Sequence, residues 1–204
     1  MTNIYSEIKE QEPLTPEIAL ETLLQGNERF IRSRMLHPNQ DEESRIAGAK
    51  EQNPFAAVIT CSDSRVSPEI IFDQGLGDLF VARIGANLVN EDIISSIEFA
   101  VNYFGVRLIV VLGHEDCGAI KSAVNSVKST KNINNLLRKL DPLVEQAKKQ
   151  SGDTLLNAVK INVNCGCKKI LSSSEVIADY VKQNKLLIKG AYYSITSGRV
   201  ELID

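Results

Sequence analysis

"FAAVITCSDSRVSPE", residues 55–69, sets a short apolar run directly before a group of costly polar side chains. The run at 55–59 is continuous and apolar, which is typical of a strand that is buried on both faces of a parallel sheet. A thiol, a carboxylate and a guanidinium follow at alternate positions as Cys61, Asp63 and Arg65. Functional crevices of open parallel sheets lie outside the carboxyl ends of the strands, so this junction is the first candidate site.

Two further apolar runs, at 78–84 and 107–113, predict two more buried strands. Between them, residues 90–105 place apolar side chains at helical spacing, with Asn90 as a candidate cap and Gly105 as a candidate stop. Strands that alternate with helices predict an α/β fold, in which a mainly parallel central β-sheet is flanked by helices.

The remaining segments extend this pattern toward both ends. Residues 16–35 predict a helix capped by Thr15, which Gly26 is expected to weaken or break in two. Further helices are expected after the third strand, with a new helix beginning at Pro142. Residues 185–195 and 199–203 predict two strands joined by a turn, which form an antiparallel edge at the C-terminus. We expect an N-terminal arm over 1–14 and a single domain over 15–204.

Composition narrows the class of protein. The chain has 204 residues, with 43% hydrophobic and 24% charged residues and a formal net charge of −3. The basic residues are scattered, so we expect no nucleic-acid partner. No stretch approaches the roughly 18 apolar residues of a spanning helix, and the first 20 residues lack the apolar core of a signal peptide. We therefore expect no membrane partner and a cytoplasmic location.

The soft metal ligands are few and well placed. The chain has four cysteines and two histidines. Cys61 follows the first strand, and His114 and Cys117 follow the third, in "GHEDCGA". If these strands are neighbours, the three side chains converge. Two cysteines and one histidine form a known ligand set of catalytic zinc, which keeps a fourth position open.

Asp63 and Arg65 are expected to form an ion pair next to such a metal. In an extended segment, residues two apart point to the same side, so Cys61, Asp63 and Arg65 share one side if the chain stays extended. We expect Arg65 to hold the Asp63 carboxylate beside the zinc rather than on it. If that pair breaks, Asp63 becomes a fourth ligand and closes the site, and this closed form is expected to be favoured at acid pH.

The motifs together carry a family resemblance. From about Leu24 to its end the chain resembles a β-class carbonic anhydrase, through "GNERF", "CSDSRVSPEIIFDQGLGDLFVARIGANLV", "SIEFAV", "GHEDCGAI" and "GAYYSITSGRVEL". The pair "CSDSR" and "GHEDCG" is highly specific for that family. The resemblance implies one Zn²⁺ per chain and reversible hydration of CO2 to bicarbonate and a proton through zinc-bound hydroxide. It implies the following site residues: zinc ligands Cys61, His114 and Cys117, a catalytic Asp63–Arg65 dyad with Asp63 as the fourth ligand of the closed state, and substrate contacts from Gln52, Phe80 and Phe99.

The resemblance also implies an assembly. The active site of the family lies at a dimer interface, with Gln52 reaching across from the partner chain. A homodimer or a dimer of dimers is therefore expected, with CO2 and bicarbonate as the small-molecule partners.

Other interpretations of the same residues remain open. The same zinc site would serve a hydrolase of a CO2 analogue, carbonyl sulfide or carbon disulfide. A binding protein with a closed structural zinc and a thiol redox enzyme using Cys61 are two further alternatives. Cys165 and Cys167 form "CGC" in a segment that is predicted to be helical, with no third ligand nearby, so we interpret them as ordinary thiols.

Overall fold

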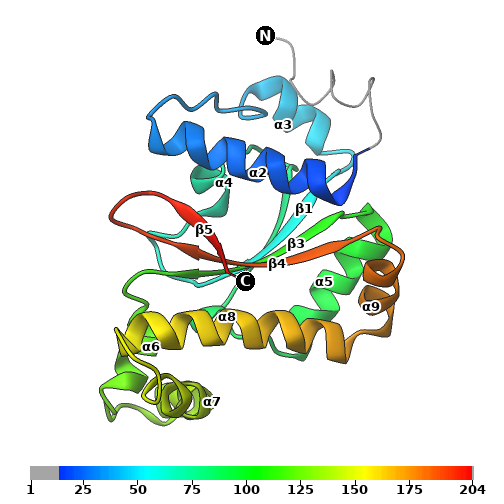
Figure 1. The fold of residues 1–204 in the computed structure, drawn as a ribbon. Helices are drawn as coiled ribbons and strands as arrows, with labels where there is room; N and C mark the ends of the chain where they lie inside the picture. Colours follow the sequence, from blue (N-terminus) through cyan, green and yellow to red (C-terminus); the bar gives the residue numbers. More distant parts are fainter. Residues whose placement is uncertain (1–13, 204) are drawn as a thin grey trace.

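The computed structural model describes residues 14–203, so residues 1–13 of the predicted N-terminal arm lie outside the described part. Figure 1 shows a central sheet between two layers of helices, as the sequence predicts. The strands are β1 (Ala56–Thr60), β2 (Leu79–Arg83), β3 (Leu108–His114), β4 (Leu187–Tyr193) and β5 (Val200–Ile203). The helices are α2 (Pro16–Ile31), α3 (Glu42–Gly48), α4 (Pro68–Ile71), the 3-10 turn η1 (Gly85–Asn87), α5 (Glu91–Phe104), α6 (Gly118–Val124), α7 (Lys131–Ala147), α8 (Thr154–Ser173) and α9 (Glu175–Lys182).

The strand order explains where a site can form. The order is β2-β1-β3-β4-β5, in which β1 pairs in parallel with both β2 and β3, β3 pairs in parallel with β4, and β5 pairs antiparallel to β4. The chain therefore leaves β1 for β2 on one side and returns to β3 on the other. Such a change of direction opens a crevice at the carboxyl ends of the two strands, which here are β1 and β3.

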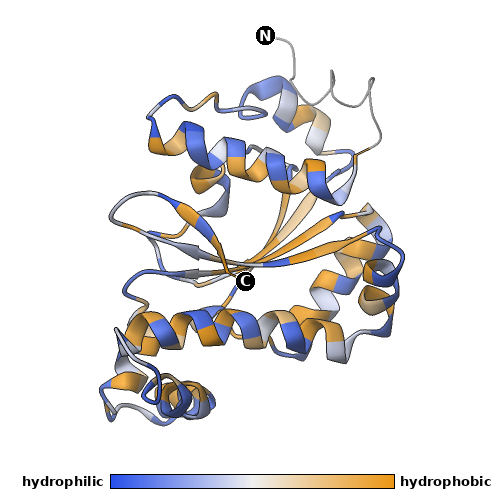
Figure 2. Cartoon of the chain, in the orientation of Figure 1, coloured by the Kyte–Doolittle hydropathy of each residue, from blue (hydrophilic) through white to orange (hydrophobic). Residues whose placement is uncertain are grey.

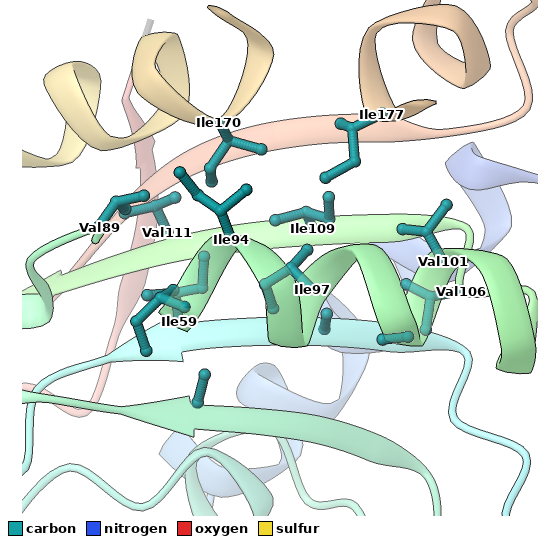
Figure 3. Close-up of a cluster of buried hydrophobic side chains, with 14 of the residues drawn as sticks. Ile59, Val89, Ile94, Ile97, Val101, Val106, Ile109, Val111, Ile170 and Ile177 are labelled. Carbon is teal, nitrogen blue, oxygen red and sulfur yellow. The ribbon is translucent and has the colours of Figure 1, made fainter. Parts of the chain in front are cut away.

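Side chains alternate between the two faces of the sheet. Ala57 and Ile59 of β1 face α5, α8 and α9, whereas Ala56 and Val58 face α2 and α4. Figure 3 shows the first of these clusters, with Ile97 of α5 packed over the strands. In Figure 2 the strands are mostly apolar while the helices show apolar and polar faces. This pattern is what a sheet covered on both faces requires.

Local signals place several helix ends as predicted. The hydroxyl of Thr15 accepts a hydrogen bond from the Ile18 amide at 3.3 Å, and the Asn90 side chain accepts one from the Ile93 amide at 2.9 Å. Gly105 ends α5 in the left-handed conformation, with φ of 65°. No helix within residues 14–203 is long and apolar enough to cross a membrane.

Two predictions about helix breaks are wrong. Gly26 does not interrupt α2, because it marks a close approach: a Cβ there would lie 1.8 Å from the carbonyl oxygen of Phe72. Pro142 does not begin a helix, since α7 runs through it. The buried Leu140 and Val144 on either side of Pro142 pack α7 into a core, and this packing outweighs a cost of about 3 kcal/mol for an internal proline.

Candidate metal centre

The three soft ligands meet where β1 and β3 end. Thr60 of β1 is in register with Leu112 of β3, so Cys61 leaves the sheet beside His114, the last residue of β3. Cys117 is the residue directly before α6. All three residues are buried, and their ligand atoms lie within 4.8 Å of one another. The adjacency of the strands, which the sequence left as a condition, therefore brings the three side chains together.

The imidazole of His114 is prepared to bind an ion. Its Nδ1 lies 2.8 Å from the carbonyl oxygen of Glu115, which accepts the ring N–H. Its Nε2 is buried and has no hydrogen-bond partner among residues 14–203. A buried nitrogen without a partner is costly, and a metal ion beside two sulfurs would satisfy it. The residues present therefore fit a tetrahedral metal such as zinc.

The two thiols are electrostatically linked. The neighbouring Cys117 thiol is the main cause that lowers the pKa of the Cys61 thiol. The nearby Cys61 sulfur, together with burial, raises the pKa of Cys117. Cys61 is therefore the thiol of the pair that ionises more readily, and a thiolate is the form that binds metal.

Asp63 and Arg65 form a close pair, but through a turn. The chain turns at residues 64–65 rather than staying extended, so the predicted extended geometry is wrong. The Asp63 Oδ1 accepts hydrogen bonds from the Arg65 amide at 3.0 Å and from its Nε at 2.9 Å, and Oδ2 accepts one from Nη2 at 2.8 Å. The turn makes three donors converge on one carboxylate. The Arg65 side chain is the largest cause that holds the pKa of Asp63 below its usual range.

Arg83 and Glu115, which lie outside the expected set of site residues, hold the segments that carry the candidate ligands. The guanidinium of Arg83 donates to the carbonyl oxygens of Cys61 at 3.1 Å and Asp63 at 2.5 Å. The Glu115 carboxylate accepts bonds from the Thr196 amide at 2.8 Å and the Ser194 hydroxyl at 3.0 Å. Glu115 thereby ties the segment after His114 to the turn between β4 and β5. These contacts join residues far apart in sequence, so spacing gives no signal for them.

The three expected substrate contacts do not join this cluster within one chain. Gln52 precedes β1, at the opposite end of the strand from Cys61, and five residues of strand span about 16 Å. Phe80 is in register with Ala57, toward the start of β1. Phe99 lies on the outer face of α5, 48% exposed, and stacks on Tyr103 with ring centroids 4.6 Å apart.

The second pair of cysteines lies elsewhere. Cys165 and Cys167 are both on α8, where Cys165 is exposed and Cys167 is partly buried. Burial raises the pKa of Cys167 to about 11. Within residues 14–203, only Cys61, His114 and Cys117 form a group of three or more histidine, cysteine or acidic side chains with ligand atoms close enough to hold an ion.

Comparison with known proteins places these features in one family. Residues 56–200 match the family model described as carbonic anhydrase. Carbonic anhydrase 2 of Mycobacterium tuberculosis is 34% identical over 193 residues, which cover 93% of this chain and 93% of that protein. The carbonic anhydrase of Mycolicibacterium smegmatis is 35% identical over 191 residues, covering 92% and 93%.

Solved structures agree with the sequence relatives. The β-carbonic anhydrase CafA of Aspergillus fumigatus superposes with a TM-score of 0.72 at 29% identity, covering 79% of this chain and 81% of that one. The β-carbonic anhydrase CcaA superposes with a TM-score of 0.70 at 25% identity, covering 91% and 95%. With a buried Cys-His-Cys cluster at the switch point of an α/β sheet, and relatives that span nearly all of its length, the chain belongs to the β-class carbonic anhydrase family of enzymes.

Proposed function

We propose that the protein hydrates CO2 reversibly to bicarbonate and a proton, with one Zn²⁺ per chain held by Cys61, His114 and Cys117. The observation that carries this proposal is the buried, unpartnered Nε2 of His114 close to two sulfurs. When bound, zinc lowers the pKa of a coordinated water enough to supply a nucleophile near neutral pH. The two thiolates contribute a charge of −2 and balance the ion.

Asp63 has the role of orienting that water. Arg65 holds its carboxylate through both oxygens, which fixes the direction of the remaining lone pairs. An ionised carboxylate can only accept hydrogen bonds, so Asp63 would accept one from the O–H of a water held by the ion and would thereby orient that water. In the closed state that we propose, Asp63 becomes a ligand only after its bonds to Arg65 break.

The substrate contacts are proposed to come from a second copy of the chain. Gln52, Phe80 and Phe99 lie away from Cys61 in their own chain, so they complete the site only if a partner supplies them. Two features support a homodimer: β2 is an edge of the sheet without a second neighbouring strand among residues 14–203, and the stacked rings of Phe99 and Tyr103 are 48% and 73% exposed. Exposed aromatic side chains are enriched at protein interfaces. Two β-carbonic anhydrases from Sordaria macrospora are described as tetrameric, which is compatible with a pair of dimers.

Stopped-flow CO2 hydration with parallel metal analysis tests the proposal. Cys61→Ser should lose the metal and the activity, and Asp63→Asn should keep one metal per chain but lose activity by about 100-fold. Cys165→Ser is the matched control, because that cysteine is exposed on α8 and should change neither quantity. Native protein without stoichiometric metal, or with faster turnover of carbonyl sulfide than of CO2, would contradict the assignment.

A further inference from the structure

The turn η1 holds an unusual backbone next to the metal ligands. Ala86 has φ of 57° and ψ of 24°, and Asn87 has φ of 44°, so two consecutive residues other than glycine adopt the left-handed conformation. Such a conformation costs free energy and persists only where surrounding contacts hold it. The Asn87 side chain does not hold the turn, because both of its amide atoms are buried without a hydrogen-bond partner among residues 14–203.

Asn162 of α8 holds the turn from the far side. Its Nδ2 donates to the carbonyl oxygen of Ala86 at 2.7 Å, and both residues are buried, with 4% and 0% exposed surface. This is a contact across 76 positions of sequence. A buried amide that donates to a single carbonyl of a strained turn restricts the ψ angle of that residue.

Close packing of α8 on the sheet brings Asn162 within reach. A Cβ on Gly113 of β3 would lie 2.7 Å from Val159 Cγ1 and from Val163 Cγ2, so α8 crosses the strand where a side chain is missing. Gly190 of β4 is packed equally closely: a Cβ there would lie 2.7 Å from Val163 Cγ1. The helix is thereby set against the sheet one residue before His114, and Asn162 lies between the two valines in sequence.

The turn η1 also lies beside Cys61. The Ile84 amide, directly before the turn, donates to the carbonyl oxygen of Thr60 at 3.1 Å, and the Arg83 side chain donates to that of Cys61 at 3.1 Å. Cys61, Ala86 and Cys117 also pack in one buried cluster. A chain of contacts therefore runs from Asn162 to the Ala86 carbonyl and, through the packing of that turn, to Cys61.

We propose that Asn162 is a positioning residue of the metal centre, which acts by fixing the Ala86 turn and, through the buried packing of that turn with Cys61 and Cys117, the orientation of the Cys61 side chain. The inference rests on the proposed function in taking Cys61 as a metal ligand. Groups that orient a ligand typically change metal affinity by 10–100-fold when removed. Since Asn162 acts through one intermediate residue, we expect the lower end, about tenfold.

Two variants and one control separate positioning from simple stability. Asn162→Ala removes the amide, and Asn162→Leu removes the donor while keeping the same number and branching of side-chain heavy atoms. Asn157→Ala is the control, because Asn157 is on the same helix and also donates its Nδ2 to a backbone carbonyl, that of Ser151 at 3.0 Å, but in a hydrogen bond that is exposed to solvent. Zinc affinity is measured by competition with a chromophoric chelator, and the ligand field by the thiolate-to-metal charge-transfer band of the cobalt(II)-loaded protein.

Both Asn162 variants should bind zinc about tenfold more weakly and shift or weaken the cobalt band, while Asn157→Ala matches the wild type. Unfolding of the metal-free proteins, followed in parallel, reports any structural effect separately. Wild-type affinity and an unchanged cobalt band in the Asn162 variants would overturn the proposal, even if their stability falls. Failure of both variants to fold would also count against it, because the amide would then be a structural requirement. Wild-type protein that binds no zinc would instead refute the proposed function, before any variant is compared.

Discussion

Substitution of Gly26 by alanine is expected to reduce the stability of the fold. Gly26 lies in α2, where helix propensity alone favours Gly26→Ala by about 1 kcal/mol. A Cβ at this position would lie 1.8 Å from the carbonyl oxygen of Phe72 and 2.7 Å from its carbon. Carbon–oxygen contacts are normally about 3.3 Å or longer, so α2 would have to move away from α4 by about 1.5 Å.

The cost follows from what that movement breaks. The side chain of the next residue, Asn27, donates to the carbonyl oxygens of Ile71 at 3.1 Å and Gly198 at 2.9 Å, and accepts from the Val200 amide at 2.9 Å. Three hydrogen bonds of the buried Asn27 side chain, at about 1 kcal/mol each, and about 1 kcal/mol of lost packing oppose the gain in helix propensity. Gly26→Ala should therefore destabilise the fold by about 3 kcal/mol, which lowers the Tm by about 9 °C in a chain of this size.

Urea unfolding and calorimetry at one fixed protomer concentration measure this effect, because association would otherwise change the apparent stability. Gly48→Ala is the matched control: Gly48 ends α3, and a Cβ there would meet nothing within 4 Å. That variant should be neutral or more stable by up to about 1 kcal/mol. Equal stability of Gly26→Ala and wild type, or equal losses in both variants, would refute the steric argument.

The buried carboxylate of Asp73 accepts bonds from the Arg29 side chain at 2.6 Å and from two backbone amides, which outweigh the effect of burial and hold its pKa below the usual range. Asp73→Asn should lower the free energy of unfolding by about 3 kcal/mol at pH 7. A carboxyl whose pKa is lowered by folding stabilises the fold only while it is ionised, so the urea unfolding curves of variant and wild type should converge as the pH falls through and below the unfolded-state pKa of about 4. A difference in stability that stays constant with pH would contradict this expectation. Gly113→Ala should destabilise the fold by about 2 kcal/mol and weaken zinc binding, because the added methyl group would push α8 away from the sheet. Wild-type zinc affinity of this variant in a chelator competition would show that α8 does not position the metal site. Tyr103→Glu should shift sedimentation profiles toward monomer, while Ile133→Glu, a comparable exposed apolar position on α7, should not; equal shifts would place the dimer surface elsewhere.

The sequence alone predicted most of the helices and strands and the three residues that form the candidate metal site. Strand runs and helix caps depend on contacts within a few residues, so the apolar run before Cys61, the Asn90 cap and the Gly105 stop could all be predicted from neighbouring positions. The candidate metal site could also be predicted from the sequence, because the chain has few cysteines and histidines. Of these, only His114 and Cys117 follow a predicted buried strand, as Cys61 does. The motifs that carried the family resemblance are likewise short and local.

Only the tertiary structure decided how these parts meet. Local pattern contains no information on which strands pair, so the register of Thr60 with Leu112 had to come from the packed sheet. The same holds for the turn that aims Arg65 at Asp63 and for the Asn162 bond to Ala86, which joins positions 76 residues apart. Local rules also failed where packing opposed them. At Gly26 the missing side chain admits a neighbouring carbonyl instead of breaking the helix, because burial gained across the chain exceeds the modest free energies of local propensity.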